Sequence, residues 1–139
     1  MRREISFTIL EKPIAQQRHR HHLNKNYNPQ YKEKIYYSQL IKNSPDVQET
    51  IQEHTLCGPL HVIISFFLPL PKTKWNRDKK GLYNINKPDL DNLIKFILDA
   101  MSGVIYADDA YIFKIEATKY NSAIPRTEVT VKEIIQEKI

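Results

Sequence analysis

The segment from Asp89 to Gly103 has the pattern of one complete amphipathic helix, and the rest of the fold must pack around it. Pro88 disfavours a helical conformation at Lys87, so the chain reaches Asp89 extended, and Asp89 is a suitable N-cap. Apolar residues then recur at helical spacing along one stripe, which predicts a helix that packs on a core. Gly103 is typical of the residue that ends a helix. The stripe consists of Leu90, Leu93, Ile94, Ile97, Leu98 and Met101.

Acidic residues border this stripe near the start of the predicted helix. Asp91, Lys95 and Asp99 step by four residues, so they share one helix face. Asp89 precedes the first turn, and Asp91 lies within it. Because the first turn has unpaired N–H groups and the positive end of the helix dipole, both carboxylates should stay ionised, and a phosphate would also bind favourably there.

A second acidic pair, Asp108 and Asp109, precedes a predicted strand over residues 111–119. Apolar and polar residues alternate in that strand, which indicates one buried face. In an α/β sandwich the start of a helix and the start of a strand can lie side by side, and their carboxylates would then converge. The expected buried face consists of Phe113, Ile115 and Ala117.

Three converging carboxylates would suit Mg²⁺, which prefers hard oxygen ligands together with water and a substrate phosphate. Such an ion polarises a phosphate, generates hydroxide from water and stabilises the leaving oxygen. Lys95 is placed to hold the scissile phosphate or to neutralise charge in the transition state. In a chain with a net charge of +5, this pattern predicts the cleavage of phosphodiester bonds.

Each of these residues also has a purely structural interpretation. Asp89 could act only as a cap, and Asp91 and Lys95 could form an exposed ion pair. Asp108 and Asp109 fit ordinary turn chemistry. A non-catalytic DNA-binding or dimerisation module is therefore an alternative to an enzyme, and convergence of the carboxylates distinguishes the two.

The stretch from Lys87 to Lys119 resembles the core of the RusA family of Holliday junction resolvases. The family pattern is D-x-D-N-x-x-K, a helix, an acidic pair and a strand that ends in lysine. The family also has a segment with proline and arginine after its first strand, which residues 12–20 resemble loosely. The resemblance implies that the catalytic carboxylates and metal ligands are Asp89, Asp91 and Asp109, that the catalytic lysine is Lys95, and that the strand-end lysine is Lys119, while Asp99 matches a helix aspartate without an assigned role.

What the resemblance implies is a Mg²⁺- or Mn²⁺-dependent endonuclease that acts as a homodimer on four-way DNA junctions, in bacteria or their phages. A two-fold dimer suits paired nicks in opposed strands. A nuclease for other branched or flap DNA is the nearest alternative enzyme, because the acidic site does not specify the shape of the substrate.

Positive charge is concentrated in two segments. Residues 69–88 carry six cations against one acid, and residues 11–27 carry four against one. Such loops supply phosphate contacts without reading sequence. The histidines at positions 19, 21 and 22 lie among these cations, which favours a DNA-facing arm over a closed metal site. Trp75 and Tyr83 could stack on unpaired bases or pack back onto the domain. The expected DNA-binding residues are Arg18, Arg20, Lys72, Lys74, Trp75, Lys79, Lys80 and Lys119.

The remaining sequence predicts a single compact domain over residues 1–139, an α/β fold in the form of an α+β sandwich with a mixed β-sheet. The expected order is one strand, two helices, one strand, one helix and two strands. The first helix is expected from Pro29 to about Asn43, and a second, shorter helix is expected to start after Ser44-Pro45. Leu60 to Leu68 is apolar enough for a central strand covered on both faces.

We expect a cytoplasmic protein without a membrane segment. The N-terminus lacks an apolar signal region, and no run of about 18 apolar residues occurs. Cys57 is the single cysteine, so neither an intramolecular disulfide nor a thiolate cluster for zinc can form.

Overall fold

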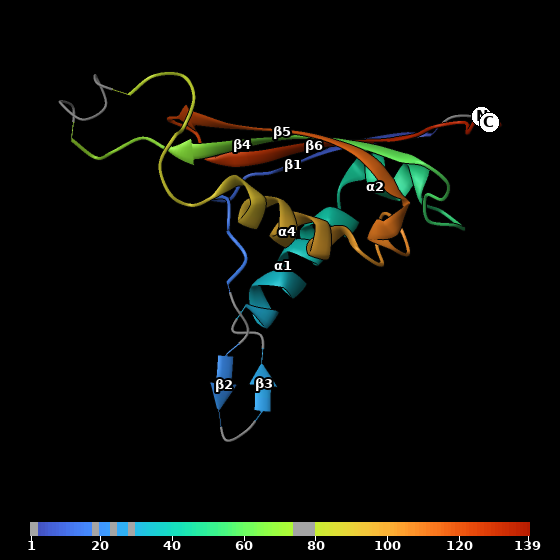
Figure 1. Ribbon diagram of the computed structural model, residues 1–139, viewed down its shortest axis with the longest axis horizontal. Coiled ribbons are helices and arrows are strands. Elements are labelled where there is room, and N and C mark those ends of the chain that lie inside the picture. Colours follow the sequence, from blue (N-terminus) through green and yellow to red (C-terminus); the bar gives the residue numbers. More distant parts are fainter. Residues whose placement is uncertain (1–2, 18–19, 23–24, 28–29, 74–79) are drawn as a thin grey trace.

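Three helices lie against one face of a mixed four-stranded sheet, as Figure 1 shows for the computed structural model of the chain. The predicted α+β architecture is thereby confirmed. The structure describes residues 3–17, 20–22, 25–27, 30–73 and 80–139. The strands of the sheet are β1 (Glu4–Ile9), β4 (Leu60–Pro69), β5 (Ile112–Ser122) and β6 (Arg126–Glu133). The helices are α1 (Tyr31–Lys42), α2 (Pro45–Thr50) and α4 (Leu90–Met101).

The strands are ordered β1-β6-β4-β5 across the sheet. β6 runs antiparallel to both of its neighbours, whereas β4 and β5 are parallel. Parallel strands need a long crossover connection, and here α4 provides it. A crossover helix runs back along the sheet. As a result, α4 begins near the carboxyl end of β4 and ends near the start of β5 (Figure 1).

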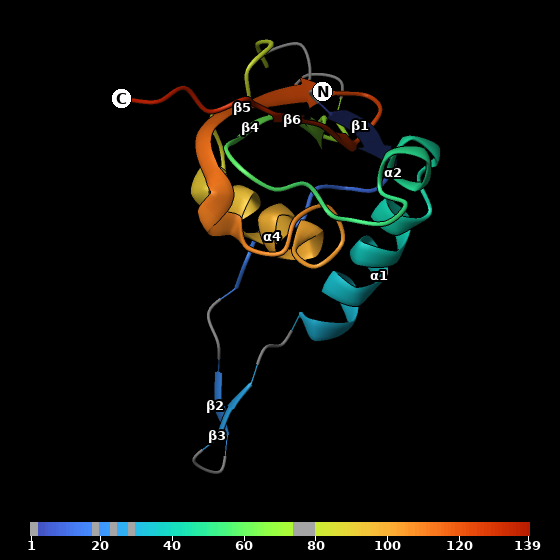
Figure 2. The same cartoon turned by 90° about the vertical axis from the view of Figure 1, so that its right-hand side faces the viewer.

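Alternate residues of β4, from Leu60 to Leu68, form the centre of the core and are buried beneath the helices. The residues between them are half-buried on the opposite face, which carries no helix (Figure 2). The predicted central strand is confirmed, but the expectation that both of its faces are covered is wrong. The physical reason is that α1, α2 and α4 all pack on the same side of the sheet.

The first half of β5 differs from the predicted strand. Phe113 is 60% exposed and Ile115 is 39% exposed, so they do not form the expected buried face. Ala117 does pack against the core. β5 is the edge strand of the sheet, and its register with β4 is irregular opposite Leu60 and His61. An edge strand lacks the second neighbour that would help to cover these side chains.

The helices before β4 lie close to their predicted positions. α1 follows Gln30, and α2 runs from Pro45 to Thr50. A short antiparallel hairpin, β2 (Arg20–His22) with β3 (Lys25–Tyr27), is absent from the sequence-based prediction. Figure 1 shows it projecting away from the sheet and helices. None of the helices in the described ranges is long and apolar enough to cross a membrane.

Candidate active site

Asp89 occupies the predicted N-cap of α4, but its carboxylate is not used as a cap. The backbone is extended, with φ −70° and ψ 143°, and within this described turn no N–H donates to the side chain. Instead, Lys87 Nζ donates to Asp89 Oδ1 at 2.8 Å. This hydrogen bond, together with the charge of Lys87, lowers the pKa of Asp89. Asp89 therefore presents an ionised and exposed carboxylate at the start of α4.

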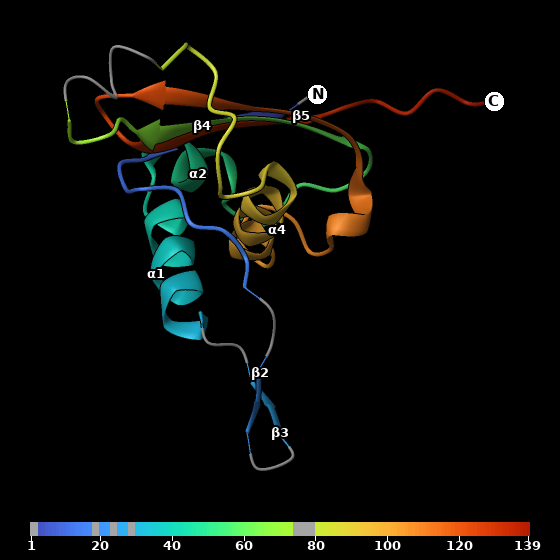
Figure 3. The ribbon, with the colours of Figure 1, turned by 60° about the vertical axis from the view of Figure 1, so that its left-hand side comes forward.

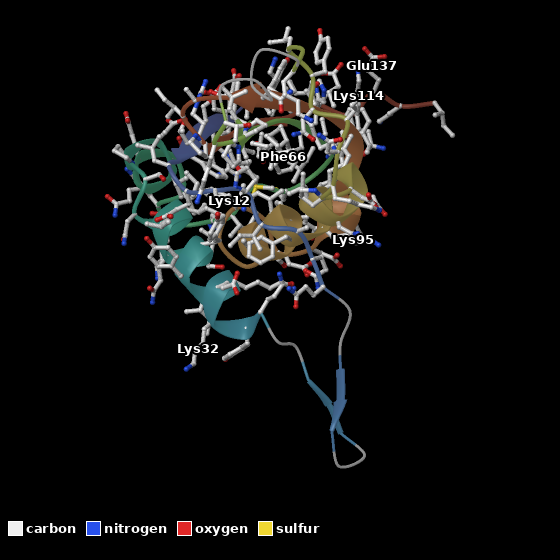
Figure 4. The ribbon with its side chains drawn as sticks, turned by 90° about the vertical axis from the view of Figure 1, so that its left-hand side faces the viewer. Lys12, Lys32, Phe66, Lys95, Lys114 and Glu137 are labelled. Atoms are coloured by element: carbon white, nitrogen blue, oxygen red, sulfur yellow. The ribbon has the colours of Figure 1, made fainter. Side chains whose placement is uncertain are left out.

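Asp91 and Lys95 lie about one turn apart on the exposed side of α4. Figure 4 shows Lys95 pointing away from the core, in which Phe66 is buried. Within the described part of the chain, neither Asp91 nor Lys95 has an ion-pair partner, so the ion pair considered as an alternative is not formed. Both charges are available to a ligand at the start of the helix.

The chain segment that leads into Asp89 is held from β5. Lys119 lies beside the buried Phe66 in the register of β5 and β4, which directs its side chain toward the helical face of the sheet. Its Nζ atom donates to the carbonyl oxygens of Asn86 at 2.7 Å and Pro88 at 2.8 Å. Two of the three donors of this ammonium group are thus engaged by the backbone. The expected DNA contact of Lys119 stays a prediction.

The segment after β1 crosses the first turn of α4. The Gln16 N–H donates to the carbonyl of Asn92 at 2.8 Å. The buried Gln30 fixes the same segment, because its Oε1 accepts from the Gln17 N–H at 2.7 Å and its Nε2 donates to the Ala15 carbonyl at 2.6 Å. The chain therefore passes beside the acidic turn at Gln16 and Gln17. No periodic signal in the sequence marks these glutamines, since their partners are distant in sequence.

The second acidic pair lies just before β5. Asp108 Oδ1 accepts from the Ala110 N–H at 2.9 Å and caps η1 (Asp109–Tyr111), a short 3₁₀ helix. The turn interpretation is thus confirmed for Asp108. Asp109 is exposed, and the ligand role that the family pattern gives it stays a prediction.

A single chain does not bring the two acidic groups together. α4 has 12 residues and spans about 18 Å at 1.5 Å per residue. Asp89 and Asp91 lie at its start, whereas η1 lies beyond its other end (Figure 1). Among the described residues, no group of three or more His, Cys, Asp and Glu side chains is placed to hold a metal ion. The expected side-by-side placement fails within one chain because a crossover helix runs antiparallel to the strands that it connects.

Asp99, which the family pattern left without a role, has a structural partner. Lys34 Nζ of α1 donates to Asp99 Oδ2 at 2.8 Å. The same ammonium group lies 5.9 Å from the centre of the Phe96 ring. Asp99 therefore helps to join α1 to α4.

The expected DNA-binding residues are described in part. Lys72 and Lys80 are exposed in the loop between β4 and α4. Figure 3 shows this loop leaving the end of β4 and returning to the start of α4. For Arg20 the structure describes the backbone of β2 alone. Outside the described residues lie Arg18, Lys74, Trp75 and Lys79.

Comparison with known proteins extends the resemblance beyond the acidic motif. The family model described as Endodeoxyribonuclease RusA matches residues 11–132. The uncharacterized protein YqaN of Bacillus subtilis (strain 168) is 31% identical over 141 residues, which cover 94% of this chain and 96% of that protein. A protein of Lactococcus phage r1t, named crossover junction endodeoxyribonuclease rusA, is 32% identical over 99 residues, which cover 70% of this chain and 68% of that protein. The chain therefore belongs to the RusA family of endodeoxyribonucleases.

Proposed function

We propose that the protein is a metal-dependent endodeoxyribonuclease that resolves four-way DNA junctions during recombination and repair. Family membership supports the endonuclease activity, and the phage relative is named for crossover junctions. The observation that carries the proposal is the exposed acidic turn of α4, in which Asp89 is kept ionised by Lys87 and makes no cap hydrogen bond. Relatives from a bacterium and a phage support a site of action in the bacterial cytoplasm.

The donors of this turn fit a hard divalent cation. Mg²⁺ and Mn²⁺ prefer carboxylate oxygens and water. A bound ion would polarise the scissile phosphate and increase the acidity of the attacking water. Asp89 and Asp91 would hold the ion. Lys95, one turn further along, would contact the scissile phosphate and offset the negative charge that develops on it.

We infer that a second copy of the chain completes each site. Asp109 lies beyond the far end of α4 in its own chain, so a site that uses it needs the partner subunit's Asp109. Apolar side chains at the end of η1 and the start of β5 are exposed, with Tyr111 at 39%, Phe113 at 60% and Ile115 at 39%. Exposed apolar surface on an edge strand is suited to association with another chain. A two-fold dimer would then carry two identical sites for paired nicks.

Cleavage of a synthetic four-way junction tests the proposal. We expect paired symmetric nicks with Mg²⁺, no nicks in EDTA, and much slower cutting of a linear duplex with the same arm sequence. Cutting that persists in EDTA would contradict metal dependence. Equal cutting of junction and duplex would contradict branch selectivity, and faster cutting of a flap substrate would favour the alternative nuclease.

A further inference from the structure

A row of four flat side chains, called here the ring column, crosses the end of the sheet on the face that carries no helix. Phe67 of β4 and Tyr120 of β5 stack with ring centres 5.0 Å apart and an interplanar angle of 18°. On the β6 side, Arg126 lies over Phe67, with its Cζ 3.7 Å from the ring centre. Tyr83 continues the column beyond Tyr120, with ring centres 5.7 Å apart and an angle of 32°.

Backbone hydrogen bonds with β5 fix Tyr83 at the end of the ring column. The Asn84 N–H donates to the Lys119 carbonyl at 3.0 Å. The Asn121 N–H donates to the Leu82 carbonyl at 2.9 Å. These two bonds add a short antiparallel segment to the edge of the sheet at this point. The ring is therefore held in place before any ligand arrives, which lowers the entropic cost of binding.

The column ends in an open ring. Tyr83 is 60% exposed although one side of its ring faces Tyr120. Among the residues that the structure describes, no second aromatic ring contacts Tyr83. A flat ligand can therefore extend the stack by one layer.

The loop that contains Tyr83 carries positive charge and leads along the chain into the candidate active site. Lys72 and Lys80 are exposed in the loop that contains Tyr83, and the side chain of Lys87 is 85% exposed. Lys119, the neighbour of Tyr120 in β5, holds the peptide that precedes Asp89. The last part of this loop leads to the start of α4 (Figure 3). The charge suits a polyanion, and the ring suits a base.

We propose that the exposed face of Tyr83 is a stacking site for an unpaired nucleobase next to the phosphodiester bond that is cut. This inference rests on the proposed function and adds to it a source of branch selectivity. A continuous duplex keeps its bases paired and stacked, whereas a branch point offers a base that leaves its stack at smaller cost. Since every base has a flat π-face, the site would accept any base.

Binding measurements on Tyr83 variants test the stacking site. Fluorescence anisotropy in EDTA would give Kd for a four-way junction and for a linear duplex without cleavage. Removal of one stacked ring weakens binding by about 5- to 150-fold, so we expect a loss in this range for Tyr83→Leu on the junction and little change on the duplex. Tyr83→Phe keeps the ring and should bind like the wild type. Tyr36→Leu, which removes a ring that is 47% exposed on α1, is the matched control.

Three results would overturn the stacking site. They are an unchanged junction affinity in Tyr83→Leu, equal losses on junction and duplex, and equal losses in the Leu and Phe variants. Cleavage by the wild type in Mg²⁺, measured in parallel, tests the proposed function separately. If the wild type never cuts the junction, the proposed nuclease function is contradicted. If Tyr83→Leu still lowers junction affinity while Tyr83→Phe does not, the stacking site is supported even then.

Discussion

The Nζ atom of Lys119 donates a hydrogen bond to the carbonyl oxygen of Pro88 at 2.8 Å, and this bond joins β5 to the residue before Asp89. The same ammonium group donates to the Asn86 carbonyl at 2.7 Å and holds the other side of the turn. Lys119 therefore positions the first carboxylate of the candidate site through the backbone. A lysine that the family pattern places at the end of a strand has, in this fold, a role that does not require DNA.

Replacement of Lys119 should uncouple the acidic turn from the sheet. Lys119→Met removes two hydrogen bonds from a charged donor, and we expect it to lower the free energy of unfolding by about 1–3 kcal/mol. The cleavage rate at saturating protein should fall, while junction affinity changes little. Lys114→Met, on the exposed part of the same strand (Figure 4), is the control and should leave both properties near wild type. A loss of affinity with an unchanged rate would instead indicate a phosphate contact.

Loss of one carboxylate should stop the chemistry and spare binding. We expect Asp89→Asn, Asp91→Asn and Asp109→Asn each to slow junction cleavage by at least about 100-fold. Affinity should be unchanged or higher, because one negative charge near the phosphates is removed. Asp99→Asn is the matched control, since that carboxylate pairs with Lys34. Near-normal cutting by Asp91→Asn in Mg²⁺ would contradict the assignment of Asp91 to the catalytic site.

Mixing two inactive variants should restore part of the activity if each site is shared between subunits. Consider a mixed dimer of Asp91→Asn and Asp109→Asn. If the sites are shared between subunits, one site of this dimer keeps both native carboxylates. If each site is built within one chain, neither site does. We therefore expect the mixture to nick one strand of the junction, whereas each variant alone does not. Nicked and resolved products separate on native and denaturing gels. If the mixture is as inactive as each variant alone, the proposal that each site is shared between two chains is contradicted.

The loop between β4 and α4 should contribute to binding through its charge. Alanine at Lys72, Lys74, Lys79 and Lys80 should weaken binding to junction and duplex alike. The slope of log K against log salt should flatten by about 0.9 for each phosphate that the variant no longer neutralises. Salt titrations of both DNAs measure this slope. An unchanged slope would mean that these lysines are only solvated.

Glu133, at the end of β6, should make stability depend on pH. It accepts hydrogen bonds from Arg3 and from the Cys57 N–H. Partial burial raises the pKa of Glu133, but these hydrogen bonds and the nearby positive charge outweigh it and leave the pKa below its ordinary value of 4.5. The ionised form therefore contributes stability above pH 4.5, and this contribution is lost as the pH falls below 4.5 through the lowered pKa.

Urea unfolding of Glu133→Gln measures that contribution. At about pH 7 the variant should be less stable than wild type by about 1–2 kcal/mol, and the difference should shrink toward about pH 3. Glu137→Gln, an exposed change four residues further along, is the control. If the difference in the free energy of unfolding stays constant from neutral to acid pH, the effect of Glu133→Gln comes from packing and not from charge.

Local patterns predicted the elements that carry the candidate site. The apolar stripe after Asp89 and the stop at Gly103 correspond to α4, and Gly103 has the positive φ of 83° that favours glycine. The apolar run from Leu60 corresponds to β4. These signals depend on neighbouring residues alone, so they can be read without knowledge of the fold. The same local reasoning was wrong for Phe113 and Ile115, because burial of an alternating strand depends on which neighbours the sheet supplies.

The sequence by itself determined the helix with its acidic first turn, the apolar central strand and the membership of a nuclease family. Tertiary structure alone decided that Lys119 and Gln30 brace the chain around that turn. It also decided that Tyr83 ends a column of flat side chains in which β6, β4 and β5 supply Arg126, Phe67 and Tyr120. It also placed Asp109 at the opposite end of α4 from Asp89. The physical reason is that capping and periodicity act within a few residues along the chain. Distances between elements follow instead from the direction of the crossover and from the order of the strands, which no local pattern contains.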